Sequence, residues 1–339
     1  MGPSGNSLPP DSDSWKEAWL ASPGPDSLKQ GTLLFSKGFC MGTADIIPGV
    51  SGGTVAFITG IYEQLLSAIT SIDVRVLGDI LRGRFQSALS RVHLRFLLIL
   101  LSGILAAVIC TARLMHYLLS EHPEMTWSFF FGLITASILV VGRSVQDWRH
   151  GLPGLLFGTL AAYVITGMIP VHTPESHWFL FLSGLFAICA MILPGLSGAF
   201  ILLILGKYAF ITSVLRDPFS WEHLQILFVF LLGCLTGILG FSRVLRYGLS
   251  RFRDVTLGML TGFMIGALRK VWPWKIRLET EIIQGREHVV REINVLPQVD
   301  DQLAWAAGLI LLGFFFVLLL ESRNSTSPME MFPSASAGK

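Results

Sequence analysis

Long apolar segments alternate with short polar loops along most of this chain. A helix needs about 20 mainly apolar residues to cross the hydrocarbon core of a bilayer, and several segments approach that length. The pattern predicts an all-α polytopic membrane protein. The predicted spans, in chain order, are 96–119, 127–142, a linking span within 151–177, 224–241, 255–268 and 303–320.

Two other apolar segments, 33–69 and 178–215, are interrupted at their centres. The first interruption contains Pro48 and Gly49. Proline removes an amide donor and each glycine costs about 1 kcal/mol inside a helix, so the helix should break there and restart near Ser51. Each arm is shorter than a full span, which favours a re-entrant hairpin with its tip near mid-membrane. A break at that depth requires protein groups or a watery cavity to satisfy the freed backbone.

The two interruptions are copies of one motif, 146 residues apart. The corresponding residues are Pro48, Gly49, Ser51 and Gly52 in the first copy and Pro194, Gly195, Ser197 and Gly198 in the second. A weaker likeness further along the chain pairs 131–143 with 257–269, and so Arg143 with Arg269. The chain is therefore a duplication, and repeats of this kind are typical of secondary transporters.

The positions of the arginines predict the orientation. The loops after residues 70, 142 and 241 are rich in arginine, whereas the turns at 120–126 and 171–177 contain no lysine or arginine. The positive-inside rule places the arginine-rich loops, and with them both termini, in the cytoplasm. Three spans separate the motif copies, so we expect inverted repeats whose tips meet at the midplane. The alternative is that each motif is one broken span, which would make the repeats parallel.

The same pattern divides the chain into segments. Residues 1–30 are rich in Pro, Ser, Gly and Asp and predict a disordered cytoplasmic tail. The remaining segments are repeat 1 (31–150), the linking span (151–177), repeat 2 (178–270), an external loop (271–302), the final span (303–320) and a second cytoplasmic tail (321–339).

Composition supports a membrane protein rather than a soluble one. Of the 339 residues, 52% are hydrophobic and only 14% are charged, and the mean hydropathy is +0.62. The net charge of +2 gives no indication of a nucleic-acid partner. The four cysteines have no CxxC spacing, which favours packing over a disulfide or a metal site. His172, Glu175 and His177 share a short turn, but two histidines are weak evidence for a metal, and we expect no metal or cofactor.

A helix that starts at each tip would suit an anion, because its first amides are unpaired and its dipole is positive there. The candidate substrate-binding residues are Ser51, Gly52, Gly53, Thr54, Ser197 and Gly198 at the tips, and Arg143 and Arg269 at the ends of equivalent spans. The turns themselves are expected to be formed by Pro48, Gly49, Pro194 and Gly195. The simpler alternatives are that the serines only cap helices and the arginines only anchor spans at the interface.

Asp45 and Glu63 are candidates for proton coupling, since a carboxylate at membrane depth is costly and usually functional. Asp45 could instead be a structural partner of the tip amides, and Glu63 could reach the interface. The second copy has Met191, Ala199, Phe200 and Ala209 where the first has Asp45, Gly53, Thr54 and Glu63. Any acid-dependent step should therefore belong to the first copy.

The segment MGTADIIPGVSGGTVAFITGIYE, with its shorter echo PGLSGAFILLILGKY, resembles the bacterial undecaprenyl-phosphate translocase family of the PopT type. The resemblance covers residues 31–320. It implies a transporter in the bacterial cytoplasmic membrane that returns the phosphate headgroup of the carrier lipid for cell-envelope synthesis. Its expected partners are a polyprenyl phosphate and the bilayer, with no nucleic acid. The residues by themselves indicate only an anion site between two hairpins.

Two other functions fit part of the pattern. An intramembrane phosphatase acting on polyprenyl pyrophosphate could use a serine on a re-entrant loop, but no histidine neighbours Ser51 or Ser197 in the sequence. A channel for small anions could use the same polar tips. Phosphate release would separate the phosphatase from the transporter, and lipid transfer in liposomes would separate the transporter from the channel.

Overall fold

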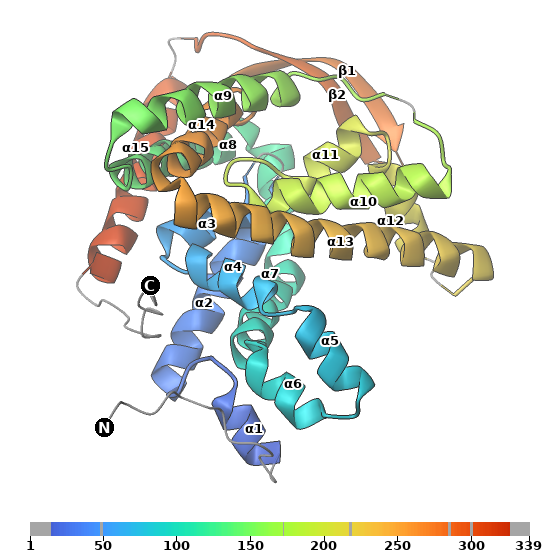
Figure 1. Cartoon of the computed structure of the whole chain (residues 1–339). Coiled ribbons are helices and arrows are strands. Elements are labelled where there is room, and N and C mark those ends of the chain that lie inside the picture. Colours follow the sequence, from blue (N-terminus) through green and yellow to red (C-terminus); the bar gives the residue numbers. More distant parts are fainter. Residues whose placement is uncertain are drawn as a thin grey trace.

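The structure, a computed structural model, describes residues 15–47, 50–171, 173–216, 219–283, 286–298 and 301–325. Helices make up nearly all of it, with one pair of strands (Figure 1). The first seven helices are α1 (Trp15–Ala21), α2 (Leu28–Asp45), α3 (Gly52–Ile58), α4 (Tyr62–Thr70), α5 (Val74–Leu81), α6 (Phe85–Arg91) and α7 (Leu94–Glu121). The next five are α8 (Pro123–Arg143), α9 (Trp148–Thr166), α10 (His177–Ile192), α11 (Gly198–Ile204) and α12 (Tyr208–Arg216). The last elements are α13 (Trp221–Arg251), α14 (Arg253–Val271), strands β1 (Lys275–Ile283) and β2 (Arg286–Asn294), and α15 (Asp301–Ser325).

Four described helices are long and apolar enough to cross a membrane: α7, α8, α13 and the Gln302–Ser322 part of α15. They cover the predicted spans 96–119, 127–142, 224–241 and 303–320. Helices α9 and α14 form where the other two spans were predicted, but they are not among the helices that meet the same criteria of length and hydropathy. They pack closely on each other through glycines, so much of their surface faces protein rather than lipid.

Both interrupted segments have the same sequence of elements. A long arm, α2 or α10, leads to the break, a short helix, α3 or α11, follows it, and a second bend leads to α4 or α12. Gly60 and Gly206 make these second bends with φ of +72° and +64°, a conformation that glycine adopts without steric cost. In the second copy the two short helices meet at 113°. Both motif copies keep a glycine at this position because the second bend requires a positive φ.

Each long arm packs against the first long helix of its own half in the same register. Glycines allow the two backbones to touch, because an added Cβ would collide with a backbone carbonyl of the facing helix. The matching contacts are Gly38 with Leu100 and Gly103 with Phe35 in the first half, and Gly184 with Phe230 and Gly233 with Phe181 in the second. The duplication is therefore preserved in the packing as well as in the motif.

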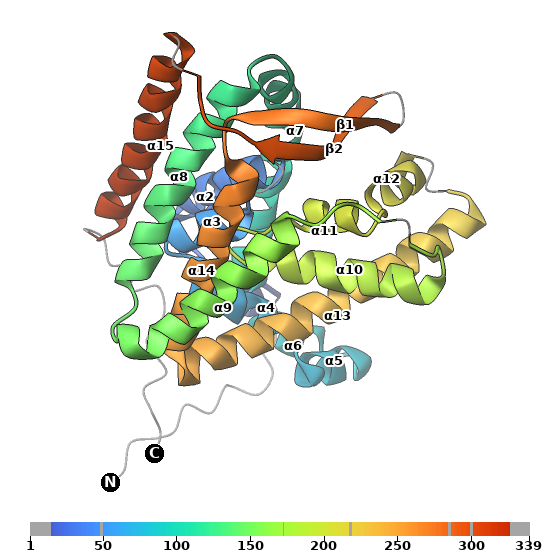
Figure 2. The same ribbon diagram turned by 90° about the horizontal axis from the view of Figure 1, so that it is seen from above.

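The two halves are interlocked by their following helices. Helix α9 packs on α14 of the other half, and α15 packs on α8 (Figure 2). Gly154 of α9 lies against the carbonyl of Val255, and Gly313 of α15 lies against the carbonyl of Phe129. Val255 and Phe129 are equivalent positions in the register that pairs 131–143 with 257–269. Helices α9 and α15 thus occupy corresponding places, and we assign each to the half that it follows in the chain.

The prediction of a disordered tail over residues 1–30 is wrong from Trp15 onward. Helix α1 packs on α6 near one end of the molecule (Figure 1). The buried guanidinium of Arg95 donates hydrogen bonds to the backbone carbonyls of Leu20, Ser22 and Pro25. An arginine that is removed from water needs such acceptors, and composition alone does not reveal that the tail supplies them. Residues 1–14 lie outside the described part.

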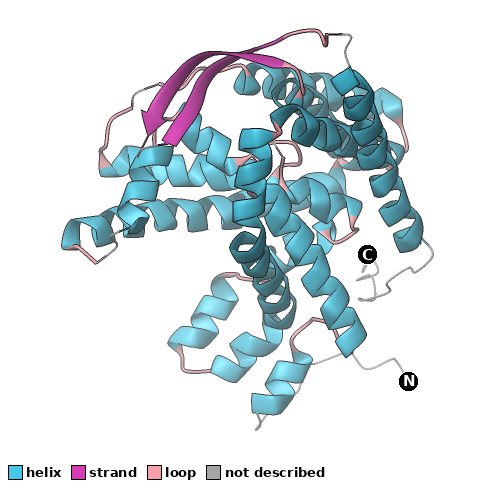
Figure 3. Cartoon of the chain, turned by 180° about the vertical axis from the view of Figure 1, so that it is seen from behind, coloured by secondary structure: helices cyan, strands magenta, loops and turns pink. Residues whose placement is uncertain are grey.

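The 271–302 segment, predicted as a loop, forms the antiparallel hairpin β1–β2, the one departure from an all-helical fold in the described part (Figure 3). Its base is fixed to the helices by Lys275, whose ammonium donates to the carbonyl of Lys270 and to Glu292 and lies 4.4 Å from the centre of the Trp127 ring. Burial lowers the pKa of Lys275 to about 8, although the charge of Glu292 opposes the shift. Lys270, at the same base, lies over the ring of Phe200 in α11.

Candidate functional site

The tips of the two interrupted segments touch each other. The hydroxyl of Ser51 lies 3.1 Å from the carbonyl oxygens of both Met191 and Leu193 and can donate to either. The hydroxyl of Tyr62 donates to the carbonyl of Ile192 at 3.2 Å. These bonds join parts of the chain that are 130 or more residues apart. The backbone freed by the second break is therefore satisfied partly by side chains of the first hairpin, as a break at membrane depth requires.

Thr54 adds a third bond between the tips. The amide of Gly195 donates to its hydroxyl oxygen at 3.0 Å, and the Thr54 side chain is fully buried. Gly195 has φ of +88° and lies against the backbone of Met264 in α14. A side chain at position 195 would be strained and would collide with α14, so this glycine, together with Pro194, forms the turn predicted for it. Pro48 and Gly49 lie outside the described residues.

The first amides of α3 are capped by side chains of their own tip. The amide of Gly52 donates to Oδ1 of Asp45 at 2.7 Å, and the amide of Gly53 donates to the Ser51 hydroxyl at 3.1 Å. A Cβ on Gly52 would lie only 2.5 Å from Oδ2 of Asp45. Glycine at this position thus allows the carboxylate to reach the start of the helix, where the dipole also favours a negative charge.

These contacts change the interpretation of the predicted anion site. The structure brings Ser51, Gly52, Gly53 and Thr54 together with the second tip, as expected, but their polar atoms already bond to protein groups. The amides of Gly52 and Gly53 are therefore not available to a phosphate in this arrangement. Binding of an anion between the tips stays a prediction for a state in which the tips separate.

The second tip is less polar than the first. Ser197 precedes α11, but its side chain makes no capping hydrogen bond. Gly198 packs against the carbonyl of Ala187 in its own arm, where an added Cβ would be 2.6 Å away. The position equivalent to Thr54 is Phe200, which has no hydroxyl and whose ring lies below the ammonium of Lys270. The two serines are thus equivalent in sequence and different in their bonding.

The remaining predicted residues have partners away from the tips. Arg143 forms a 3.8 Å ion pair with Glu321 of α15. Arg269 donates to the carbonyl of Tyr163 in α9 and lies 4.5 Å from the centre of its ring. Among the hydrogen bonds and ion pairs of the described residues, none joins either arginine to a tip. Their contacts stabilise the crosswise packing of α15 on α8 and of α9 on α14, and a role in binding substrate stays a prediction.

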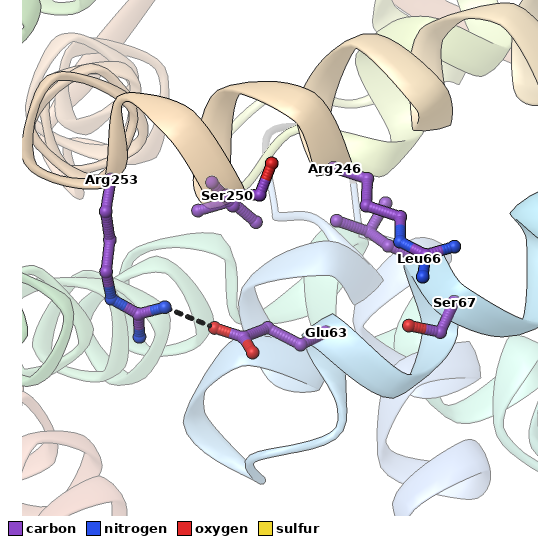
Figure 4. A pocket seen from close by; sticks show the side chains of 7 residues that line it. Glu63, Leu66, Ser67, Arg246, Ser250 and Arg253 are labelled. Carbon is purple, nitrogen blue, oxygen red and sulfur yellow. Dashed lines mark hydrogen bonds and ion pairs between the residues drawn. The ribbon is translucent and has the colours of Figure 1, made fainter. Parts of the chain in front are cut away.

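Glu63 lies at the start of α4 and lines a pocket between α4 and the end of α13 (Figure 4). Its carboxylate pairs with the guanidinium of Arg253 at 3.0 Å, and both side chains are largely exposed. From the sequence alone, the arginines of 243–253 indicated only the orientation, and this pocket was not predicted. The available signal was the spacing of Arg246 and Ser250, which are four residues apart and so share a helix face.

Comparisons with known proteins identify the family of the chain. A family model described as undecaprenyl phosphate translocase-like matches residues 41–289. A polyprenyl-phosphate transporter from Vibrio cholerae serotype O1 is 40% identical over 293 residues, which cover 84% of this chain and 94% of that protein. A polyprenyl-phosphate transporter from Staphylococcus aureus is 31% identical over 253 residues, covering 70% of this chain and 84% of that protein. No solved structure matches the chain. The chain therefore belongs to the undecaprenyl phosphate translocase-like family.

Proposed function

We propose that this protein transports polyprenyl phosphate across a membrane. The observation that carries the proposal is the 40% identity along nearly the whole of a relative named as a polyprenyl-phosphate transporter. The helices long enough to span a bilayer and the duplicated, interlocked halves support it. More specifically, we propose that the substrate is undecaprenyl phosphate, which is returned across the bacterial cytoplasmic membrane for reuse as a carrier lipid. We also propose that the protein is a transporter rather than an enzyme.

In this proposal the contact between the tips is the closed gate. Three hydrogen bonds join the tips, through Ser51, Thr54 and Tyr62. Bonds of this kind contribute about 0.5–1.5 kcal/mol each, so opening the gate costs about 3 kcal/mol from these bonds. A phosphate that binds the open state more tightly than the closed one can compensate for that amount.

Opening would free the groups that the sequence singled out. The hydroxyls of Ser51, Thr54 and Ser197 would become available to the headgroup, and Gly52, Gly53 and Gly198 would allow the backbone to approach it closely. Moving one net elementary charge against the membrane potential costs a free energy of about 2.3 kcal/mol per 100 mV. A proton carried by Asp45 would reduce the charge that crosses with the phosphate, which is why we retain Asp45 as the coupling candidate.

The function is tested with purified protein in liposomes that contain a labelled polyprenyl phosphate. We expect transfer of the lipid between leaflets at a rate that rises with protein content, with no transfer in protein-free liposomes. Release of inorganic phosphate from polyprenyl pyrophosphate, measured in the same preparation, would favour the phosphatase. Flux of small anions without lipid transfer would favour the channel.

The proposed orientation has both termini in the cytoplasm and inverted hairpins. Arg84 lies between α5 and α6 and Glu175 lies before α10, and both are exposed. In a variant without the four native cysteines, Arg84→Cys should react with an impermeant thiol reagent only from the cytoplasmic side. Glu175→Cys should react only from the outside. Labelling of both from one side would contradict the inverted arrangement.

A further inference from the structure

The pocket beside Glu63 is not used by the contact between the tips. It has a volume of about 200 Å³, several times the roughly 30 Å³ that one water occupies in the liquid. Two arginines, two serines, one carboxylate and two leucines surround it (Figure 4). The lining residues are Glu63, Leu66 and Ser67 of α4, Arg246, Leu249 and Ser250 of α13, and Arg253 of α14.

The charges at this pocket are positive in sum. Arg253 is paired with Glu63, whereas Arg246 donates to the neutral hydroxyl of Thr70 at 2.7 Å. No ion pair of Arg246 occurs among the described residues. Arg243, one turn earlier on α13, donates to the carbonyl of Ile72, so it adds a further positive charge nearby. Burial, and then the charge of Arg246, lower the pKa of His93 on the neighbouring segment.

The lining also suits a molecule with a charged head and an apolar tail. Arginine guanidinium groups bind phosphate oxygens in pairs of hydrogen bonds, and the serine hydroxyls can supplement them. Leu66 and Leu249 are buried and form an apolar wall. These two side chains offer apolar surface to the first part of a prenyl chain attached to a bound phosphate.

The corresponding place in the other half lacks these groups. Glu63 corresponds to Ala209 in the motif repeat. In the register that aligns Leu100 with Phe230, Arg246 corresponds to His116, and in the register that aligns Phe129 with Val255, Arg253 corresponds to Trp127. The two halves therefore share their helix packing, but the charged groups of the pocket occur in one half only. This difference is expected if the pocket functions on one side of the molecule.

We infer that this pocket is a docking site for the phosphate headgroup of a prenyl phosphate, bound by Arg246 and Arg253 before the headgroup reaches the tips. Glu63 holds Arg253 in place until the phosphate displaces it. This inference rests on the proposed function. It assigns Glu63 the part of an exchangeable counter-ion, in place of the proton coupling predicted from the sequence.

The test measures binding of farnesyl phosphate, a short prenyl phosphate, to purified full-length protein in detergent. Arg246→Ala and Arg253→Ala should each weaken binding about tenfold, as expected for loss of a charge-assisted bond. Arg251→Ala, which removes an exposed arginine of α13 that does not line the pocket, is the matched control and should bind as the wild type does. Glu63→Gln should strengthen binding about threefold, because Arg253 loses its competing partner.

Other ligands distinguish the source of the phosphate. Farnesol should not compete, and inorganic phosphate should compete only weakly, if the arginines and the wall of Leu66 and Leu249 act together. Competition by inorganic phosphate as strong as by farnesyl phosphate would overturn the prenyl part of the inference. Equal binding by Arg246→Ala, Arg253→Ala and Arg251→Ala would overturn the site.

Transport assays keep this test separate from the test of function. If the wild type transports the lipid and both arginine variants transport equally well, the docking site is wrong and the function stands. If the wild type neither binds nor transports a prenyl phosphate, the function itself is wrong. Arg246→Lys retains the charge without the planar fork and should bind between wild type and Arg246→Ala, a graded result that misfolding would not produce.

Discussion

Replacing Asp45 with asparagine is expected to lower lipid transport about tenfold, which corresponds to about 1.4 kcal/mol, because the negative charge and the proton site at the tip are lost. Asparagine can still accept the hydrogen bond from the amide of Gly52, which is 2.7 Å from Oδ1 of Asp45, so the tip should keep its shape. The variant loses the charge and the ability to take up a proton. Transport by Asp45→Asn should therefore also lose the pH response of the wild type.

Asp45→Leu separates the structural contribution from the charge. Leucine leaves the Gly52 amide without its acceptor, which costs about 1–3 kcal/mol for a buried donor. This variant should melt at a lower temperature, whereas Asp45→Asn should melt close to the wild type. Glu63→Gln is the comparison for the pH response only, because Glu63 bonds to Arg253 in the proposed docking pocket rather than to a tip, and it should keep the pH response of wild-type transport. Wild-type transport and pH response in Asp45→Asn would reduce Asp45 to a helix cap.

The elements that the sequence predicts correctly are those determined locally. The spans follow from the length and apolarity of single segments, and four of them recur as α7, α8, α13 and α15. The breaks follow from glycines and a proline that no helix favours. In each case the cause lies within about ten residues of the effect.

The features that the sequence did not predict depend on which distant group a polar atom bonds to, or which distant helix a segment packs against. Ser51 was expected to cap a helix, and it does, but its second partner is a carbonyl of the other half, 140 or more residues away. Arg95 was counted as a loop arginine, yet it holds the chain between α1 and α2. The swap of α9 and α15 between the halves likewise depends on glycine contacts that no single segment contains. A sequence shows that a polar group needs a partner and does not show which partner it finds.

The contact between the tips should be most sensitive to a substitution of Gly53. A Cβ at this position would lie 2.6 Å from the carbonyl oxygen of Ile192. That oxygen belongs to the backbone at the end of α10, so relief requires the two halves to move apart. Gly53→Val should therefore lower the melting temperature and reduce transport more than any serine substitution at the tips. Gly31→Val, in α2, is the matched control, because an added Cβ there meets nothing within 4 Å.

The two tip serines should then differ in a defined order. Ser51→Ala removes the cap of the Gly53 amide and the bond to the second tip, at a cost of about 1–2 kcal/mol. Ser197→Ala removes no side-chain cap and should leave the melting temperature nearly unchanged. A catalytic serine would also give unequal effects on activity, but it would leave the stability of Ser51→Ala at the wild-type level. Melting temperature and transport, measured together for these variants at equal membrane levels, decide between the two.

If Gly53→Val is as stable as Gly31→Val, the tips are not held by the contact described here. If Ser197→Ala loses transport at unchanged stability, its free hydroxyl contacts the headgroup in the open state.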